Sequence, residues 1–177
     1  MPILQSSSDM KIECARPEQY EAVCAVLAEG DAAQEAQLPE VFCKKSGPTR
    51  PLEFLVRRMH GPDSAVLVAL LDAEVVGVLE VVMKPPPDRD GHVPRRVALI
   101  DNVVVRASHR RRGIGSKLFA HAETWAIDQG ATAMELNVWS TNTPAKRLYE
   151  SLGYAARLVR MERLLDGKSQ AGEQVEA

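Results

Sequence analysis

The chain has 177 residues and a formal net charge of −2, and 45% of its residues are hydrophobic while 26% are charged. These totals are typical of one globular domain with a core of its own, and they exclude a protein that binds polyanions through overall positive charge. No apolar run approaches the roughly 20 residues of a membrane-spanning helix, and the polar N-terminal residues differ from a signal peptide, so we expect a cytoplasmic protein without a membrane partner. The three cysteines are too scattered for a disulfide framework or a zinc site.

The domain limits follow from where the apolar patterns begin and end. We predict one folded domain over residues 11–164, preceded by a flexible leader over residues 1–10 and followed by a flexible polar tail over residues 165–177. The sequence shows no internal repeat that would indicate a solenoid or an array.

The first part of the domain is predicted to hold a strand and two helices. Residues 11–15 form a short strand, and apolar side chains then recur at helical spacing from Pro17 to Gly30-Asp31, where we expect the helix to end. A looser segment punctuated by prolines follows, and a second helix is expected over residues 52–59.

Three strands are predicted in the middle of the chain. Residues 65–71 and 75–83 are rich in Val and Leu and are separated by Asp72-Ala73-Glu74, a spacing that indicates a hairpin. Residues 97–105 form a near-continuous apolar run, as expected for a central strand that is buried on both faces.

The last third of the domain predicts two more helices and two more strands. A helix begins at Ile114 and ends at Gly130, because its apolar residues lie on one stripe and glycine favours the left-handed conformation that often ends helices. The next strand, over residues 134–138, should lie parallel to the strand before this helix. A helix over residues 143–152 and a final strand over residues 156–163 complete the domain.

The stretch from Arg106 to Lys117 joins the central apolar strand to the helix and carries the strongest functional signal. Its glycines and the helix N-terminus direct several backbone N–H groups to one spot, which suits a phosphate. The P-loop pattern fails because Ser116 and Lys117 stand in the wrong order, and the dinucleotide fingerprint fails because Leu118 replaces its third glycine. A solvated basic surface and a nucleic-acid patch are the alternatives, although no aromatic residues are interleaved with the arginines.

Two segments resemble one known family. Arg110-Arg111-Arg112-Gly113-Ile114-Gly115 matches the pattern R/Q-x-x-G-x-G/A, and the segment from Asn142 to Tyr154 matches N-x-x-A-x-x-x-Y-x-x-x-G-F/Y. Both patterns are similar to those of the GNAT acyltransferase superfamily, whose members bind acetyl-CoA through the first of them. The resemblance covers roughly residues 11–163 and is strongest over residues 97–154.

The resemblance implies a fold, an activity and a cofactor. The fold would be of the α/β (α+β) class, with a central mixed, mostly antiparallel sheet, a splayed pair of parallel strands and about four flanking helices. The activity would be transfer of an acetyl group from acetyl-CoA to a primary amine, by direct attack and without a covalent enzyme intermediate. The residues that the resemblance places against coenzyme A are Val103, Val104, Val105, Arg110, Arg111, Arg112, Gly113, Ile114, Gly115, Ser116, Lys117, Asn142, Ala145 and Tyr149.

This chemistry needs a neutral amine, a stabiliser for the oxyanion and a proton for the leaving thiolate. By resemblance, Tyr149 is the candidate general acid, with a core tyrosine as the alternative, and the backbone N–H of Val103 or Val104 serves the oxyanion. Asp101 is the candidate base, because a carboxylate in an apolar strand needs a reason, and an ion pair or an edge position is the alternative. We expect Glu80 to be structural or to face outward. The family often relays the proton through water.

Three polar residues near the motifs have simpler interpretations. Asn142 either caps the last helix or hydrogen-bonds the pantetheine arm, and the sequence does not separate the two. The side chains of His109 and His121 are expected to be exposed to solvent.

The acceptor is predicted to be a small-molecule or peptide amine. The family builds its acceptor pocket around the first two helices, where acidic residues would suit a cationic amine: Glu29, Asp31, Glu35, Glu40 and Glu53. A protein N-terminal acetyltransferase is an alternative within the same class, and a non-catalytic acyl-CoA-binding regulatory module is an alternative outside it. A nucleic-acid partner and a metal are not expected, and a homodimer is a family tendency.

Overall fold

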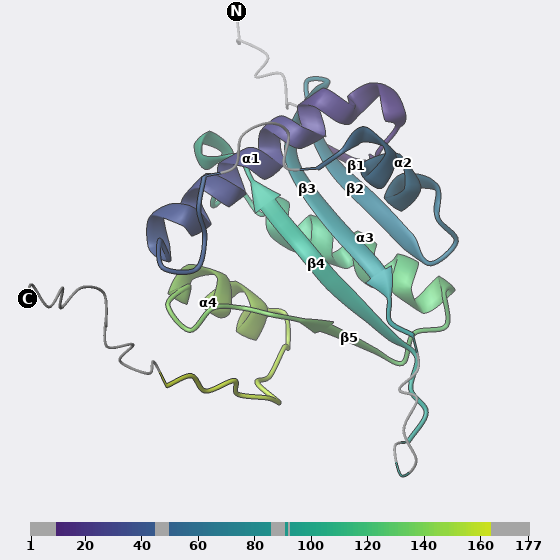
Figure 1. Cartoon of the computed structure of the whole chain (residues 1–177). Helices are drawn as coiled ribbons and strands as arrows, with labels where there is room; N and C mark the ends of the chain where they lie inside the picture. The colour runs from purple at the N-terminus through teal and green to yellow at the C-terminus, as the bar shows by residue number, and fades with distance from the viewer. Residues whose placement is uncertain (1–9, 45–49, 86–90, 92, 164–177) are drawn as a thin grey trace, which may run out of the picture.

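The computed structural model describes residues 10–44, 50–85, 91 and 93–163. Its strands form one sheet in the order β1-β2-β3-β4-β5 (Figure 1). Neighbouring strands from β1 to β4 are antiparallel, whereas β4 and β5 are parallel, which confirms the predicted mixed sheet. The strands are β1 (Met10–Cys14), β2 (Ser64–Leu71), β3 (Glu74–Met83), β4 (Val97–Val105) and β5 (Ala133–Leu136).

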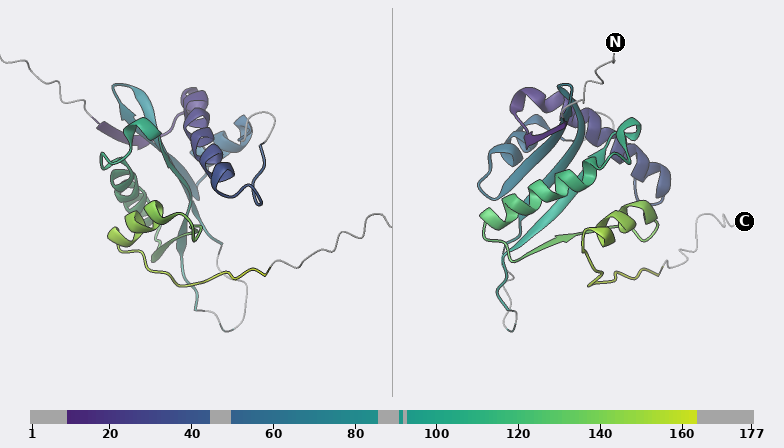
Figure 2. Two further views of the ribbon diagram at one scale, coloured as in Figure 1. Left: turned by 90° about the vertical axis from the view of Figure 1, so that its left-hand side faces the viewer. Right: turned by 180° about the vertical axis from the view of Figure 1, so that it is seen from behind.

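Helices cover both faces of this sheet. Figure 2 shows α1 (Tyr20–Gln37) and α2 (Leu52–His60) on one face and α3 (Ile114–Asp128) on the other. Because successive strand side chains alternate between faces, each face has its own apolar core: Val68 and Val78 pack under α1, while Leu79 and Val81 pack under α3. α4 (Thr143–Ser151) packs its aromatic and apolar residues against the α3 core. Two short 3-10 helices, η1 (Pro17–Gln19) and η2 (Ala107–His109), precede α1 and α3.

Most predicted elements are confirmed with ends shifted by one or two residues. The hairpin forms as expected, with Asp72 and Ala73 at positive φ in a two-residue turn. Met10, which was assigned to the leader, begins β1, and the rest of the leader and the tail over residues 165–177 lie outside the described residues. Within the part of the chain that is described, no helix is both long and apolar enough to cross a membrane.

The predicted end of α1 at Gly30-Asp31 is wrong, because the helix continues to Gln37. A methyl group on Gly30 would lie 2.5 Å from Cγ2 of Val104, so the bare glycine lets α1 approach β4. Glycine is therefore needed here for close packing. In the sequence it resembles a helix terminus, because glycine commonly ends helices. The continuation of α1 beyond Asp31 carries Gln34 and Gln37.

We expect Gly30→Ala to lower the free energy of unfolding by about 1–3 kcal/mol, because the added methyl group forces α1 away from β4. In an open helix position the same change would stabilise by about 1 kcal/mol, so the sign of the effect tests the packing. Ala32, which is exposed on the same helix, supplies the control: Ala32→Gly should cost roughly 1 kcal/mol through helix propensity alone. Urea unfolding curves of the two variants measure both effects. A Gly30→Ala protein more stable than the wild type would contradict the close approach.

The predicted final strand over residues 156–163 does not form. This segment is exposed along its length and pairs with no strand, and its apolar side chains Leu158, Val159 and Met161 are 90%, 76% and 88% exposed. A strand needs a neighbour for its backbone groups, and local apolar composition alone does not supply one.

β4 is buried on both faces only in its first half. Val97, Ala98 and Ile100 are buried, whereas the residues from Asn102 to Val105 are partly exposed. The prediction of a fully buried central strand is therefore wrong for the second half. The reason is that β5 pairs with β4 only as far as Ile100, opposite Leu136.

Candidate active site

A cleft opens where β4 and β5 separate. Residues 101–105 of β4 line one side and residues 137–139, which follow β5, line the other side, and the cavity has a volume of about 620 Å³. The register of β4 against β3 shifts at the same place, because Glu80 lies opposite Asn102 while Val81 lies opposite Ile100. Asp101 is thus the extra residue of a β-bulge, a feature that bends its strand and ends regular pairing.

The free edge of β4 presents backbone groups to this cleft. The N–H of Arg106 donates to the carbonyl of Val76 on β3 at 2.9 Å, and backbone groups alternate in direction along an antiparallel pair. The N–H of Val104 therefore faces β3, and the N–H of Val103 faces the cleft. Of the two donors that the sequence left open for the oxyanion, this geometry favours Val103.

The loop before α3 has the backbone of an anion-binding nest. Arg110 is extended, Arg111 has a φ of +60°, and Gly113 caps α3 with a φ of +76°. The left-handed Gly113 is followed directly by right-handed helical residues, a change of hand that turns successive N–H groups toward one point, and the first N–H groups of α3 have no partner within the helix. Arg111 in a left-handed conformation costs roughly 1–3 kcal/mol, a strain that concentrates at functional sites.

The basic run divides into a structural part and a cleft-lining part. Arg106 forms an ion pair with Glu29 at 2.8 Å and donates to the carbonyl of Val75, so it holds α1 to the sheet. Arg110 and Arg111 line the cleft, and Nε of Arg110 donates to the carbonyl of Val105 at 3.1 Å. The local charge therefore gathers at the nest.

Tyr149 lies on α4 and lines the cleft opposite the end of β4. Its ring packs against Phe119 and Tyr154, with ring centroids 5.5 Å and 6.2 Å away. Burial raises the pKa of Tyr149 above its usual value, because the phenolate would lose solvation. The phenol therefore stays protonated at the cleft wall.

Asn142 is a helix cap that also lines the cleft. Its Oδ1 accepts a hydrogen bond from the backbone N–H of Ala145 at 3.2 Å at the start of α4. His121 is exposed as expected, but the prediction for His109 is wrong, since this half-buried side chain lines the cleft.

The end of the cleft away from the nest is acidic and partly apolar. Asp31 and Gln34 line it from α1, and Trp139 lines it from the segment after β5. The rings of Phe42 and Trp139 meet edge to face, with centroids 5.8 Å apart, so the segment after α1 contacts the segment after β5. Asp101 also lines the cleft and accepts a hydrogen bond from Arg58 of α2 at 2.8 Å, which makes the predicted base one half of an ion pair.

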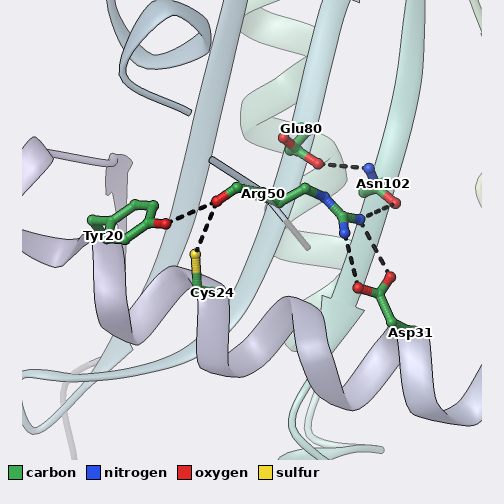
Figure 3. Close-up of polar contacts among 6 residues, drawn as sticks. All are labelled: Tyr20, Cys24, Asp31, Arg50, Glu80 and Asn102. Carbon is green, nitrogen blue, oxygen red and sulfur yellow. Dashed lines mark hydrogen bonds and ion pairs between the residues drawn. The ribbon is translucent and has the colours of Figure 1, made fainter. Parts of the chain in front are cut away.

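A polar network lies behind this acidic end (Figure 3). The Arg50 guanidinium donates to both carboxylate oxygens of Asp31, at 2.8 Å and 3.3 Å, and to Oδ1 of Asn102 at 3.5 Å. The backbone carbonyl of Arg50 accepts from the Tyr20 hydroxyl at 2.8 Å. Nδ2 of Asn102 donates to Oε2 of Glu80 at 2.6 Å. The network joins α1, the start of α2, β3 and β4.

The cleft collects most of the predicted site residues. Arg112 and Lys117 are exposed and do not line it. Those that do line it are Asp101, Val103, Val104, Val105, Arg110, Arg111, Gly113, Ile114, Gly115, Ser116, Asn142, Ala145 and Tyr149. Among the acidic residues proposed for the acceptor, Asp31 alone lines the cleft.

Sequence reasoning missed Asn102, Gln34 and Trp139. No motif marks them, because the continuation of α1, the bulge in β4 and the separation of β5 bring them together. The break of an apolar strand by two polar residues, Asp101-Asn102, was the available signal for the bulge.

Comparison with known proteins identifies the family of this chain. The model of the acetyltransferase (GNAT) family matches residues 31–154. A streptothricin acetyltransferase of Escherichia coli is 29% identical over 92 residues, which cover 52% of this chain and 48% of that protein. The chain thus spans about half the length of that curated relative.

Solved structures share the fold. A mutant of a Bacillus halodurans protein superimposes with a TM-score of 0.82 at 24% identity, covering 88% of this chain and 99% of that one. AAC(6')-Iy, in complex with the bisubstrate analog CoA-S-monomethyl-acetylneamine, has a TM-score of 0.64 at 18% identity, covering 89% and 100%. The family match extends from α1 to the end of the segment after α4, and so includes the nest, the cleft and Tyr149. The chain belongs to the acetyltransferase (GNAT) family.

Proposed function

We propose that this protein transfers an acetyl group from acetyl-CoA to a primary amine by direct attack of the amine on the thioester. One observation carries the proposal: a single cleft runs from an anion-binding nest at Gly113, along the free edge of β4, to an acidic end at Asp31. The nest suits the pyrophosphate of coenzyme A, and the acidic end suits a cationic amine. The strand edge between them suits the amide groups of the pantetheine arm.

The residues present fit coenzyme A. The nest N–H groups, Arg110 and Arg111 supply donors and positive charge for its phosphates. When bound, acetyl-CoA supplies an activated acetyl group. The N–H of Val103 faces the cleft, where it can stabilise negative charge on the thioester oxygen, and Tyr149 can protonate the leaving sulfur.

Asp101 is the proposed acceptor of the amine proton, either directly or through water. Asp101 lines the cleft at the bulge, and the hydrogen bond from Arg58 orients its carboxylate. Asp31 lines the same end, and its carboxylate, although paired with Arg50, keeps lone pairs that can accept a hydrogen bond from an ammonium group. We infer that the acceptor is a small cationic amine, and the similarity to a streptothricin acetyltransferase makes streptothricin one candidate to test.

Calorimetry with acetyl-CoA, dephospho-CoA and NAD tests the donor. We expect acetyl-CoA to bind, dephospho-CoA to bind more weakly by about tenfold because it lacks the 3′-phosphate, and NAD to give no signal. A panel of streptothricin, an aminoglycoside, spermidine and a peptide with a free N-terminus then tests the acceptor by release of coenzyme A. Absence of acetyl-CoA binding would remove the proposal. Binding without turnover of any amine would favour a non-catalytic acyl-CoA-binding module.

A further inference from the structure

Glu80 is the one charged or polar side chain that is buried among the described residues, with 1% exposure. It lies on β3 two residues after Val78 and so shares the face that packs under α1. Its Oε2 accepts from Nδ2 of Asn102 at 2.6 Å, and its Oε1 is buried without a hydrogen-bond partner in the described part of the chain. Glu80 does not itself line the cleft. Its burial agrees with the expected structural role and shows that the outward-facing alternative is wrong.

A carboxyl group at this place is costly. Burial raises the pKa of Glu80, and the hydrogen bond from Asn102 and the charge of Arg50 offset only part of that effect. An apolar residue of similar size would avoid this desolvation at little or no cost to stability. The burial of a carboxyl here therefore indicates a role that packing does not supply, and the carboxyl is hydrogen-bonded to Asn102.

The contact with Glu80 decides which way the Asn102 amide points. An asparagine presents a donor at one end and an acceptor at the other, and its donor end is the one that meets the ionised carboxylate of Glu80 or the carbonyl oxygen of the neutral acid. In this orientation Oδ1 points toward Arg50, whose guanidinium also holds the cleft residue Asp31 (Figure 3). A carboxyl oxygen accepts this hydrogen bond in the charged form and, as the carbonyl, in the neutral form.

Oδ1 of Asn102 keeps free capacity to accept. The Arg50 contact is long, at 3.5 Å, and an amide oxygen has two lone pairs. Asn102 lines the cleft directly after the bulge residue Asp101 and before Val103, whose N–H faces the proposed thioester. Arg50 also ties Asp31 to this place through two hydrogen bonds. An amine that approaches the thioester would meet oxygen acceptors of Asn102 and Asp31.

We propose that Glu80 is a positioning residue, which holds Asn102 with its Oδ1 toward the cleft so that this oxygen accepts a hydrogen bond from the acceptor amine. The inference rests on the proposed function and adds to it the group that orients the amine. If the amide turned over, its NH₂ would face an incoming ammonium group and repel it.

The test compares Glu80→Met with Glu80→Gln. Glutamine keeps an oxygen for Asn102 Nδ2, whereas methionine fills similar space without an acceptor. We expect Glu80→Met to raise the KM of the best amine in the panel about tenfold, with the KM for acetyl-CoA unchanged, and Glu80→Gln to restore the wild-type KM. Asn102→Ala should match Glu80→Met, and the double variant should be no worse than Asn102→Ala alone, because both changes remove one interaction.

A second readout needs neither acceptor nor turnover. In NMR spectra of the chain, the side-chain amide protons of Asn102 should exchange slowly with solvent in the wild type and in Glu80→Gln, and rapidly in Glu80→Met. Thermal unfolding of each variant shows whether it is folded, and Asn102→Ala replaces Glu80→Met if the methionine variant is not.

Three results would overturn the inference. An unchanged amine KM in a folded Glu80→Met protein would make the contact merely structural. A kcat loss in Glu80→Gln equal to that in Glu80→Met, with the loss of a limb of the pH profile, would make Glu80 a proton carrier. Additive losses in the double variant would show that the two residues act independently. Failure of the proposed function appears earlier, as a wild-type chain that neither binds acetyl-CoA nor acetylates an amine.

Discussion

Tyr149→Phe is expected to lower kcat about 10²-fold and to leave the KM for acetyl-CoA within about twofold, because the hydroxyl acts on the departing sulfur while the ring keeps its packing. Tyr149 lines the cleft from α4 and packs against Phe119. Phenylalanine retains that packing and removes only the hydroxyl group. Steady-state rates of coenzyme A release with a saturating amine measure the effect.

Tyr154→Phe is the matched control. Tyr154 belongs to the same aromatic cluster, with its ring centroid 5.7 Å from that of Phe119, and burial raises its pKa to about 12, yet it does not line the cleft. Removing its hydroxyl should leave kcat unchanged. Equal losses in both variants would point to disturbed packing of α4 instead of lost proton transfer.

The pH dependence of kcat gives a further test of the proposed role of Tyr149 as general acid. Because burial raises the pKa of Tyr149 above its ordinary value of about 10, ionisation of the phenol should not lower the wild-type kcat between pH 6 and about 9. The loss in Tyr149→Phe should therefore be constant over that range. Full kcat in Tyr149→Phe at every pH would show that the thiolate obtains its proton elsewhere.

The sequence predicts what depends on local pattern. The loop from Arg110 to Gly115 could be recognised because a tight turn, positive charge and a helix N-terminus must be contiguous to bind a phosphate. Strand–helix–strand order likewise fixed the parallel pairing of β4 with β5. The sequence could therefore predict most residues that line the half of the cleft proposed to hold the cofactor, but not that Arg112 and Lys117 lie outside it.

The acceptor half depends on contacts between distant segments. Gly30 indicated a helix end because glycine has a low helix propensity. Helix propensity does not reveal that the absence of a side chain at Gly30 makes room for the side chain of Val104. The position of Asn102 in the site depends on its hydrogen bond to Glu80, 22 positions earlier, and on a bulge that arises from the pairing of two strands. Residues 156–163 have the composition of a strand, but no described strand lies beside them. Each difference arose where tertiary packing outweighed local preference.

Gly113→Ala should weaken acetyl-CoA binding about 30-fold, or about 2 kcal/mol, as measured by calorimetry. Gly113 holds a φ of +76° at the start of α3, and no atom lies within 4 Å of the place where a Cβ would stand. That open space is where the proposed pyrophosphate approaches the backbone. A methyl group there would hold the phosphate away from the N–H groups, and the left-handed conformation would itself cost an alanine about 1–2 kcal/mol.

Gly130→Ala separates these two effects, because Gly130 lies just beyond the other end of α3 with a nearly equal φ of +74°. Its Cβ would meet only Arg96, at ordinary contact distance, so the strain is matched while the cleft is untouched. Both variants should lose similar stability, and Gly113→Ala alone should lose affinity. Wild-type affinity in a folded Gly113→Ala protein would mean that the nest does not hold the phosphate. Equal loss of acetyl-CoA affinity in both variants would attribute the effect to strain at the ends of α3. Gly130 does not line the cleft, so a methyl group there cannot exclude a ligand by contact.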